Sequence, residues 1–324
     1  MAAFNAPITH AQTESTLGQA FIYAENQIRE RLVEDLEVTG EGLVVGWGDL
    51  AGQGTDTVRI THWTGLGMAE EFQAMVGETD EPTPTGFEAD NDTATIARYA
   101  LAKDQTYQSA ILSSEVARAI YGLDRMAVQL PMSLGATIRS LWADTLGTFS
   151  SSYGDSGVEW TMDHELALVA GFRETAGYSV AKHGAPVAGR HPVQLTQLRK
   201  AIRNEPAFQT PDVAAAINGL GGEAGGGFAF LGLRNIGSPS VGSSGGDYLG
   251  GAYIPGAVGI VVASGRAAPV QDPARTIYVD EFGLIMEVRS RPGAATMTFT
   301  ANAHLGMAKR SALVFPQFKI LSKV

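Results

Sequence analysis

Residues 57–103 read TVRITHWTGLGMAEEFQAMVGETDEPTPTGFEADNDTATIARYALAK. Val58 and Ile60 on the entry side, and the β-branched and aromatic residues of 93–103 on the exit side, predict two strands that form a stem. Between Ile60 and Ala97 there is no Lys or Arg, but there are eight carboxylates: Glu70, Glu71, Glu78, Asp80, Glu81, Glu88, Asp90 and Asp92. A loop this long without its own core is either functional or disordered. We expect it to pack on a basic surface outside its own domain, and a disordered surface loop is the open alternative.

Length and composition indicate a globular protein with a sizeable core. The chain has 324 residues, of which 44% are hydrophobic and 18% charged, enough for two domains or for one domain with large insertions. A formal net charge of −11 argues against sequence-reading nucleic-acid binding, although an acidic protein can lie beside DNA without gripping it. The absence of cysteine excludes disulfides, thiolate metal sites and a cysteine nucleophile. No apolar run approaches the roughly 20 residues that span a bilayer, so we expect a soluble, cytoplasmic product without a membrane partner.

Apolar periodicity predicts helices on both sides of the acidic loop. An interrupted i, i+4 series after Ser15 predicts an amphipathic helix that ends near Gly40, followed by a short strand at 43–45 among glycines. Beyond the loop, apolar residues at spacings of three or four predict a short helix at 113–121 and a long helix at about 125–149. Gly122 and Asp124 divide the two, and Pro131 predicts a kink or a delayed start in the second.

The second half of the sequence predicts mixed α and β structure. Helices are expected at 192–202, with Pro192 at the first position, and at 210–217. Strand patterns occur at 257–263 and 296–303, and a hairpin is expected at 276–279 and 284–288. The stretches 219–227 and 232–251 are glycine-rich and are expected to be loops around a short apolar segment at 228–233, and a last apolar stretch covers 312–318.

Motifs that would indicate catalysis all lack their context. Gly242 to Gly246 matches G-x-S-x-G, but in a Gly/Ser-rich loop rather than at a strand-to-helix turn. The sequence at 154–157 resembles a serine-protease turn without the rest of that pattern, and 163–165 (Asp-His-Glu) is expected to be a solvated run. The tryptophans are interpreted as packing anchors. The sequence therefore predicts no catalytic, cofactor-binding or metal-binding residue.

The order of these parts resembles one known family. The likeness is carried by Thr57-Val58-Arg59-Ile60 leading into Met68-Ala69-Glu70-Glu71, and by Ser113-Ser114-Glu115-Val116-Ala117 through Gly122-Leu123-Asp124 into Arg139-Ser140-Leu141-Trp142-Ala143 and Gly147-Thr148-Phe149. The chain resembles the major capsid proteins of tailed bacteriophages, which have the Hong Kong 97-type fold. The shared order is an arm, a loop on a two-stranded stem, a long helix, a glycine-rich α/β region and returning strands. Encapsulin shells share that fold.

The resemblance implies an α+β fold with an N-terminal arm at 1–56, an extended loop at 57–103, a peripheral domain at 104–165 with a spine helix at about 125–149, an axial domain at 166–289 and returning peripheral strands at 290–324. It implies a non-enzymatic shell subunit that forms hexamers and pentamers in an icosahedral or prolate head around double-stranded DNA. The implied partners are a scaffolding protein, a portal and decoration proteins, and the implied location is the virion, assembled in the host cytoplasm. Because the arm starts near Met1, the scaffold would be a separate protein or an already removed segment. The first lysine is Lys103, so the loop-lysine cross-link of some members is not available.

The acidic loop and the basic residues of the chain are the expected assembly contacts. On this hypothesis carboxylates of one subunit meet cations of another, with the candidates Glu70, Glu71, Glu78, Asp80, Glu81, Glu88, Arg118, Arg125, Arg139, Lys309 and Arg310. Two alternatives stay open: an encapsulin-like shell around a protein cargo, and an α/β enzyme whose glycine-rich loops at 219–227 and 232–251 bind a phosphate-bearing ligand.

Overall fold

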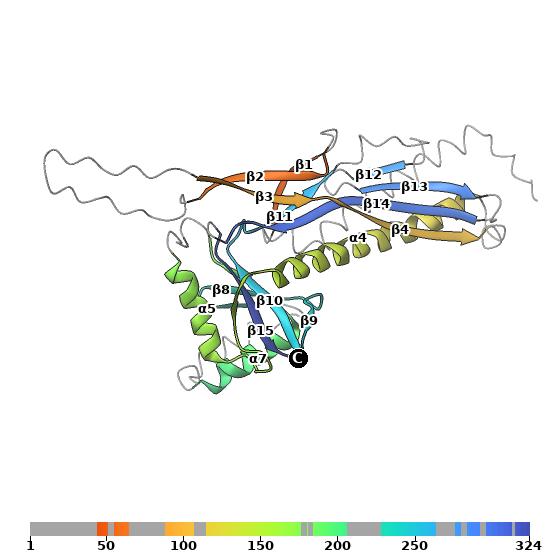
Figure 1. Cartoon of the computed structure of the whole chain (residues 1–324). Helices are drawn as coiled ribbons and strands as arrows, with labels where there is room; N and C mark the ends of the chain where they lie inside the picture. The colour runs from red at the N-terminus through yellow and green to blue at the C-terminus, as the bar shows by residue number, and fades with distance from the viewer. Residues whose placement is uncertain are drawn as a thin grey trace, which may run out of the picture.

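The computed structural model describes residues 44–50, 55–64, 88–106, 115–175, 180, 184–205, 228–263, 276–279, 284–291, 296–312 and 315–324. These residues form two large sheets, a separate two-stranded stem and three helices of more than ten residues (Figure 1). The predicted helices after Ser15 and at 210–217 lie outside the described residues. The α+β class expected from the sequence is confirmed.

The first sheet has six strands and contains the longest strand of the described chain. Its order is β1-β11-β14-β13-β12. β4 also pairs with β14, along the edge of β14 opposite β13. β1 runs parallel to β11, whereas the other pairs are antiparallel. Its members are β1 (Val45–Asp49), β4 (Ala97–Thr106), β11 (Val258–Val262), β12 (Thr276–Val279), β13 (Leu284–Arg291) and β14 (Thr296–Lys309).

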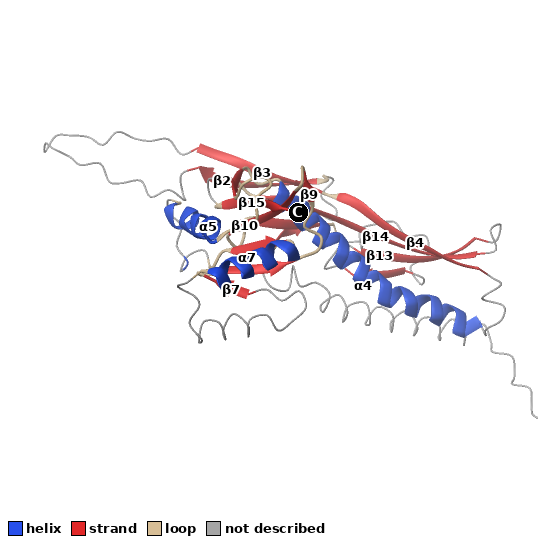
Figure 2. Cartoon of the chain, turned by 90° about the horizontal axis from the view of Figure 1, so that it is seen from below, coloured by secondary structure: helices blue, strands red, loops and turns tan. Residues whose placement is uncertain are grey.

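The second sheet has seven strands and includes the C-terminal strand of the chain. Its order is β5-β15-β10-β6-β8-β7, with β9 paired to β10. Two helices, α5 (Met162–Glu174) and α7 (Pro192–Asn204), pack against it and against each other (Figures 1 and 2). The strands are β5 (Ser151–Tyr153), β6 (Val187–Arg190), β7 (Phe228–Phe230), β8 (Leu233–Gly237), β9 (Ser243–Ser244), β10 (Asp247–Tyr253) and β15 (Gln317–Lys323).

The helix α4 (Glu115–Gly147) is continuous over 33 residues, about 50 Å at 1.5 Å per residue (Figure 2). The predicted division at Gly122 and Asp124 is therefore wrong, and the helix also continues through Pro131. A glycine inside a helix costs only about 1 kcal/mol relative to alanine. Apolar side chains at every fourth position outweigh that cost by packing into the core: Met126, Leu130, Leu134, Ile138, Trp142 and Leu146 are all buried.

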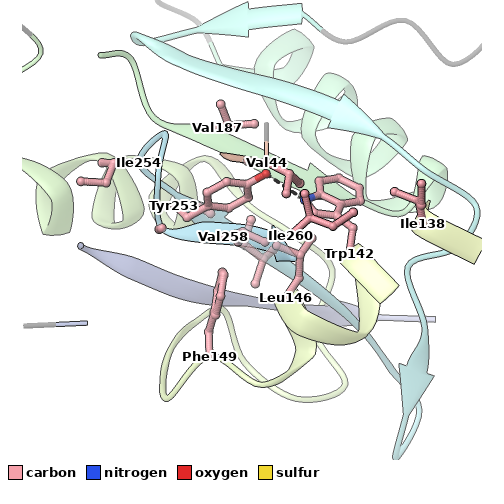
Figure 3. Close-up of a cluster of buried hydrophobic side chains, with 14 of the residues drawn as sticks. Val44, Ile138, Trp142, Leu146, Phe149, Val187, Tyr253, Ile254, Val258 and Ile260 are labelled. Atoms are coloured by element: carbon pink, nitrogen blue, oxygen red, sulfur yellow. Dashed lines mark hydrogen bonds between the residues drawn. The ribbon is translucent and has the colours of Figure 1, made fainter. Parts of the chain in front are cut away.

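One continuous core joins α4 to both sheets. The C-terminal third of α4 contacts β10, and the indole Nε1–H of Trp142 donates a 2.8 Å hydrogen bond to the hydroxyl of Tyr253 (Figure 3). Burial raises the pKa of that hydroxyl strongly, so Tyr253 stays protonated while its oxygen accepts the indole N–H. Both side chains are completely buried, which confirms the interpretation of Trp142 as a packing anchor.

Two glycines paired across β6 and β10 form the surface on which α4 lies. Gly189 is opposite Gly251 in the strand register. A Cβ atom at Gly189 would lie 2.5 Å from side-chain atoms of both Leu146 and Trp142, and one at Gly251 would lie 2.9 Å from the ring of Phe149. The helix can approach the sheet this closely because neither strand has a side chain there.

This packing explains why the expected loop at 232–251 is wrong in large part. β8, β9 and β10 lie within or begin in that range, and β10 is a central strand with buried residues from Gly250 to Tyr253. The strand expected at 43–45 is found later in the sequence, again at a place where a glycine allows close packing. β1 covers Val45 to Asp49, and Gly259 on β11 leaves room for the indole of Trp47.

Other predictions from the sequence are confirmed. α7 begins with Pro192 after His191, whose Nδ1 accepts a hydrogen bond from the Val193 N–H at 3.2 Å. β11 matches the strand expected at 257–263, and β12 and β13 pair as the expected hairpin. β14 contains the strand expected at 296–303 but extends to Lys309.

The sheets do not follow the expected domain ranges in every place. β11, β12 and most of β13 fall in the range 166–289 but belong to the six-stranded sheet, and β15 falls in the range 290–324 but belongs to the seven-stranded sheet. The division into arm, loop, peripheral and axial domains stays a prediction.

Candidate assembly surfaces

The stem consists of β2 (Thr57–Thr64) and β3 (Glu88–Thr95), which pair with each other and with no other strand of the described chain. The antiparallel register runs from Thr57 opposite Thr95 to Thr64 opposite Glu88. The single exit strand expected at 93–103 is therefore wrong in its bounds, because this range is divided between two strands at Ile96. β3 is the acidic segment, whereas the apolar residues after Ile96 form β4 in the six-stranded sheet.

The base of the stem is fixed to the body by a small apolar cluster. Leu50, Ala94 and Val261 are buried there, and partly buried side chains such as Val58 and Ile96 surround them. The Ile96 N–H donates a 2.8 Å hydrogen bond to the Asp56 carbonyl, which closes the stem at its root. The stem points along the molecule in the opposite direction to the far ends of β4 and β13 (Figure 1).

The acidic residues of the region fall into two groups. Glu88, Asp90 and Asp92 lie on β3, whereas Glu70, Glu71, Glu78, Asp80 and Glu81 lie outside the described residues. The carboxylate of Asp92 is 11% exposed, and its Oδ2 lies 3.6 Å from Nε of Arg310 in the same chain. At least one carboxylate thus has a cationic partner within its own subunit.

The basic candidates lie in different environments. Arg125 is exposed and Arg139 half-buried on α4, whereas the side chain of Arg118 lies outside the described residues. Lys309 is half-buried, and its Nζ donates a 2.6 Å hydrogen bond to the Thr148 carbonyl just beyond α4. Burial, and secondarily the charge of Lys319, lower the pKa of Lys309. Lys309 and Arg310 therefore make contacts inside the subunit that the sequence did not reveal.

Two large apolar side chains are exposed next to Arg125 on α4. Val128 is 37% and Met132 58% exposed, and their spacing of four residues places them one above the other on the helix. Arg125 is three residues before Val128, so the same side of α4 presents a cation and two apolar side chains. A surface of this kind is complementary to a segment that carries both carboxylates and apolar residues.

The motifs considered for catalysis have structural roles. Ser156 Oγ donates to Asp247 Oδ2 at 2.5 Å and the Gly157 N–H donates to Oδ1 at 2.7 Å, so the turn at 154–157 is attached to β10. These hydrogen bonds lower the pKa of Asp247. Gly242 to Gly246 contains the short strand β9 and does not form a strand-to-helix turn. No cluster of three or more His, Asp or Glu in the described residues could hold a metal ion.

The expectation of a solvated Asp-His-Glu run at 163–165 is wrong for Glu165. Glu165 is fully buried on α5 and forms a 2.5 Å ion pair with the buried guanidinium of Arg190. The indole Nε1–H of Trp160 donates to the same carboxylate oxygen at 2.9 Å, and Arg190 stacks 4.7 Å from the Trp160 ring centroid. The sequence offered no signal for this pair because Glu165 and Arg190 are 25 residues apart and meet only in the folded chain.

Comparisons with solved structures identify the fold. The chain is similar to the capsid of a native GTA particle, with a TM-score of 0.57, 9% identity and coverage of 90% of this chain and 91% of that chain. It is similar to the capsid of Ralstonia phage GP4 (TM-score 0.53, 12% identity, 86% and 85% covered) and to the capsid of Myoviridae phage XM1 (TM-score 0.53, 9% identity, 88% and 91% covered). No protein-family model and no curated protein sequence matches the chain. The resemblance to the Hong Kong 97-type capsid proteins is thus confirmed for the fold, over most of the chain.

None of the helices in the described part of the chain combines the length and apolar character needed to span a bilayer.

Proposed function

We propose that this chain is the structural, non-enzymatic subunit of a tailed-phage-type head. The observation that carries the proposal is the likeness to phage capsid structures over about nine-tenths of the chain, including two sheets, one long helix and a projecting stem. On this proposal the subunits form hexamers and pentamers that close an icosahedral or prolate shell around double-stranded DNA. The shell belongs to the virion and is assembled in the host cytoplasm with a scaffolding protein, a portal and decoration proteins.

The net charge of −11 supports a container that does not grip its contents. Protein that binds DNA tightly neutralises phosphates with clustered Lys and Arg, and each such contact steepens the dependence on salt. An acidic wall instead repels the phosphate backbone, so the packaged DNA can leave the shell.

The content of purified particles distinguishes this proposal from an encapsulin-like shell. Particles made during phage growth should contain double-stranded DNA, seen by absorbance at 260 nm and by nuclease-resistant DNA on a gel. Particles that contain a single protein cargo and no DNA would favour the encapsulin alternative. The enzyme alternative relied on two glycine-rich loops, and β8, β9 and β10 take up most of the second one, at 232–251. Only a small discrete oligomer that binds nucleotide would support the enzyme alternative again.

We propose that the acidic loop binds the exposed side of α4 in a neighbouring subunit. That side carries Arg125 with Val128 and Met132, and the loop sequence 68–76 (MAEEFQAMV) combines Glu70 and Glu71 with apolar residues. Each exposed ion pair contributes only about 0.2–1 kcal/mol, but the contact is repeated in every subunit of the shell.

A charge-reversal experiment tests this contact. Replacing Glu70, Glu71, Glu78 and Glu81 together by Lys should leave the subunit folded and reduce the particle yield, and Arg125→Glu in the same chain should restore part of it. The yield of the unchanged protein should fall with added salt, because screening acts over about 8–10 Å at ordinary ionic strength. If the quadruple variant assembles normally at low and high salt alike, the loop is solvated surface and the contact does not exist.

A further inference from the structure

Arg310 lies where the stem, the six-stranded sheet and the seven-stranded sheet meet. It directly follows β14, and its Nε is 3.6 Å from Asp92 Oδ2 on the stem strand β3. Its guanidinium stacks 4.1 Å from the ring centroid of Phe315, in the link from β14 to β15. Its backbone N–H donates a 2.7 Å hydrogen bond to the Ala257 carbonyl before β11, and its carbonyl accepts a hydrogen bond from the side chain of Gln317 at the start of β15.

We propose that Arg310 is the residue that sets the direction of the stem relative to the seven-stranded sheet. The ion pair with Asp92 attaches β3 to a residue whose backbone is bound on both sides, by Ala257 and by Gln317. The two side chains are only 20% and 11% exposed, so solvent and salt screen their attraction less than they screen a surface pair. The importance of this direction for assembly rests on the proposed function, whereas the link itself does not.

Contacts at the root of the stem act together with this ion pair to fix the direction. At the C-terminal end of β3 the backbone carbonyl of Thr95 lies directly against Gly306, and a Cβ atom at Gly306 would collide with it. Thr95 and Asp92 are three residues apart, about 10 Å along a strand. The apolar cluster around Ala94 and the contact at Gly306 hold the root of the stem, so without the Arg310 pair the stem can still rotate about that root. The ion pair at Asp92 adds a point of attachment farther along β3 and limits that rotation.

The matched control for Arg310 is its neighbour. Lys309 is also a cation at the end of β14, but its Nζ reaches the Thr148 carbonyl beyond α4 and not the stem. Removing the charge of Lys309 therefore tests the general effect of losing a cation here, and removing that of Arg310 tests the attachment of the stem.

The chain has no cysteine, so a pair of spin labels can be introduced without removing any native thiol. Labels at Arg59→Cys on β2 and Thr196→Cys on α7, both exposed positions, report the distance between the stem and the seven-stranded sheet. In the full chain, kept unassembled by dilution, we expect one narrow distance distribution. Arg310→Met and Asp92→Asn should each broaden it and remove the single narrow peak, whereas Lys309→Met should leave it unchanged.

The outcome does not depend on whether a shell forms. A narrow, unshifted distribution in both Arg310→Met and Asp92→Asn, with folding verified by circular dichroism, would overturn the proposal. If Arg310→Met does not fold, Asp92→Asn decides the question from the stem side. In assembly, the same variants should give particles of mixed size or open sheets in place of uniform shells. A protein that forms no particles at all, yet shows the broadening, would refute the proposed function and leave the role of Arg310 intact.

Discussion

Replacing Gly189 by alanine tests the packing that joins α4 to the seven-stranded sheet. The new methyl group would lie 2.5 Å from Cδ1 of Leu146 and from the ring of Trp142, far inside van der Waals contact. Both neighbours are completely buried, and the Trp142 ring is also held by its hydrogen bond to Tyr253, so neither can turn away freely. Overpacking of a well-packed core costs about 1–3 kcal/mol. For a chain of this size that free energy corresponds to a fall in Tm of roughly 2–10 °C.

The assay is thermal or urea unfolding of the unassembled subunit, followed by circular dichroism. The matched control is Gly242→Ala, because Gly242 is exposed and a Cβ there would have no atom within 4 Å, so its effect should stay within about 0.5 kcal/mol. Adding Leu146→Ala to Gly189→Ala should cost less than the sum of the two single changes, since the truncated side chain leaves room for the new methyl group. Equal stability of Gly189→Ala and Gly242→Ala would refute the packing argument.

Two further predictions concern pH and covalent state. Nδ1 of His191 accepts a hydrogen bond from the Val193 N–H, so the imidazole must be neutral to cap α7. Burial lowers the pKa of His191 in the folded protein. The stabilisation by this cap is therefore complete above the ordinary pKa of about 6.5 and is lost as the pH falls through the lower pKa of the folded state. His191→Asn keeps a cap that does not titrate, so its Tm should fall less than that of the unchanged protein between neutral and mildly acidic pH, and parallel curves would contradict this. Because the chain has no cysteine and no lysine between Thr57 and Ala102, mature particles boiled in detergent should run as single chains near 34.1 kDa, and a ladder of covalent multimers would be inconsistent with that.

The sequence predicts elements whose signals are local. α7 has a proline at its first position and a regular apolar pattern, and the hairpin of β12 and β13 has two apolar runs around a polar turn. Such signals do not depend on what lies beside the element in space. These elements are accordingly found within a few residues of their predicted bounds.

Elements that depend on distant partners could not be predicted. Gly250 and Gly251 suggest a loop by propensity, but in β10 they lie directly against Gln194 on one side and Phe149 on the other, where any side chain would be too large. α4 continues through Gly122 because its buried stripe packs along the core. The partners of Arg310 and Glu165 are likewise far away in the sequence, so a count of charges cannot find them.

The central claim, that this chain builds a large closed shell, is tested most directly by measuring the mass of the assembled protein. Multi-angle light scattering of the purified full chain, alone and with the separate scaffolding protein that the proposed function expects, should reveal particles of megadalton mass, far above the 34.1 kDa of one chain. A well-folded preparation that stays a monomer or dimer at high concentration, even with the scaffold present, would contradict the account.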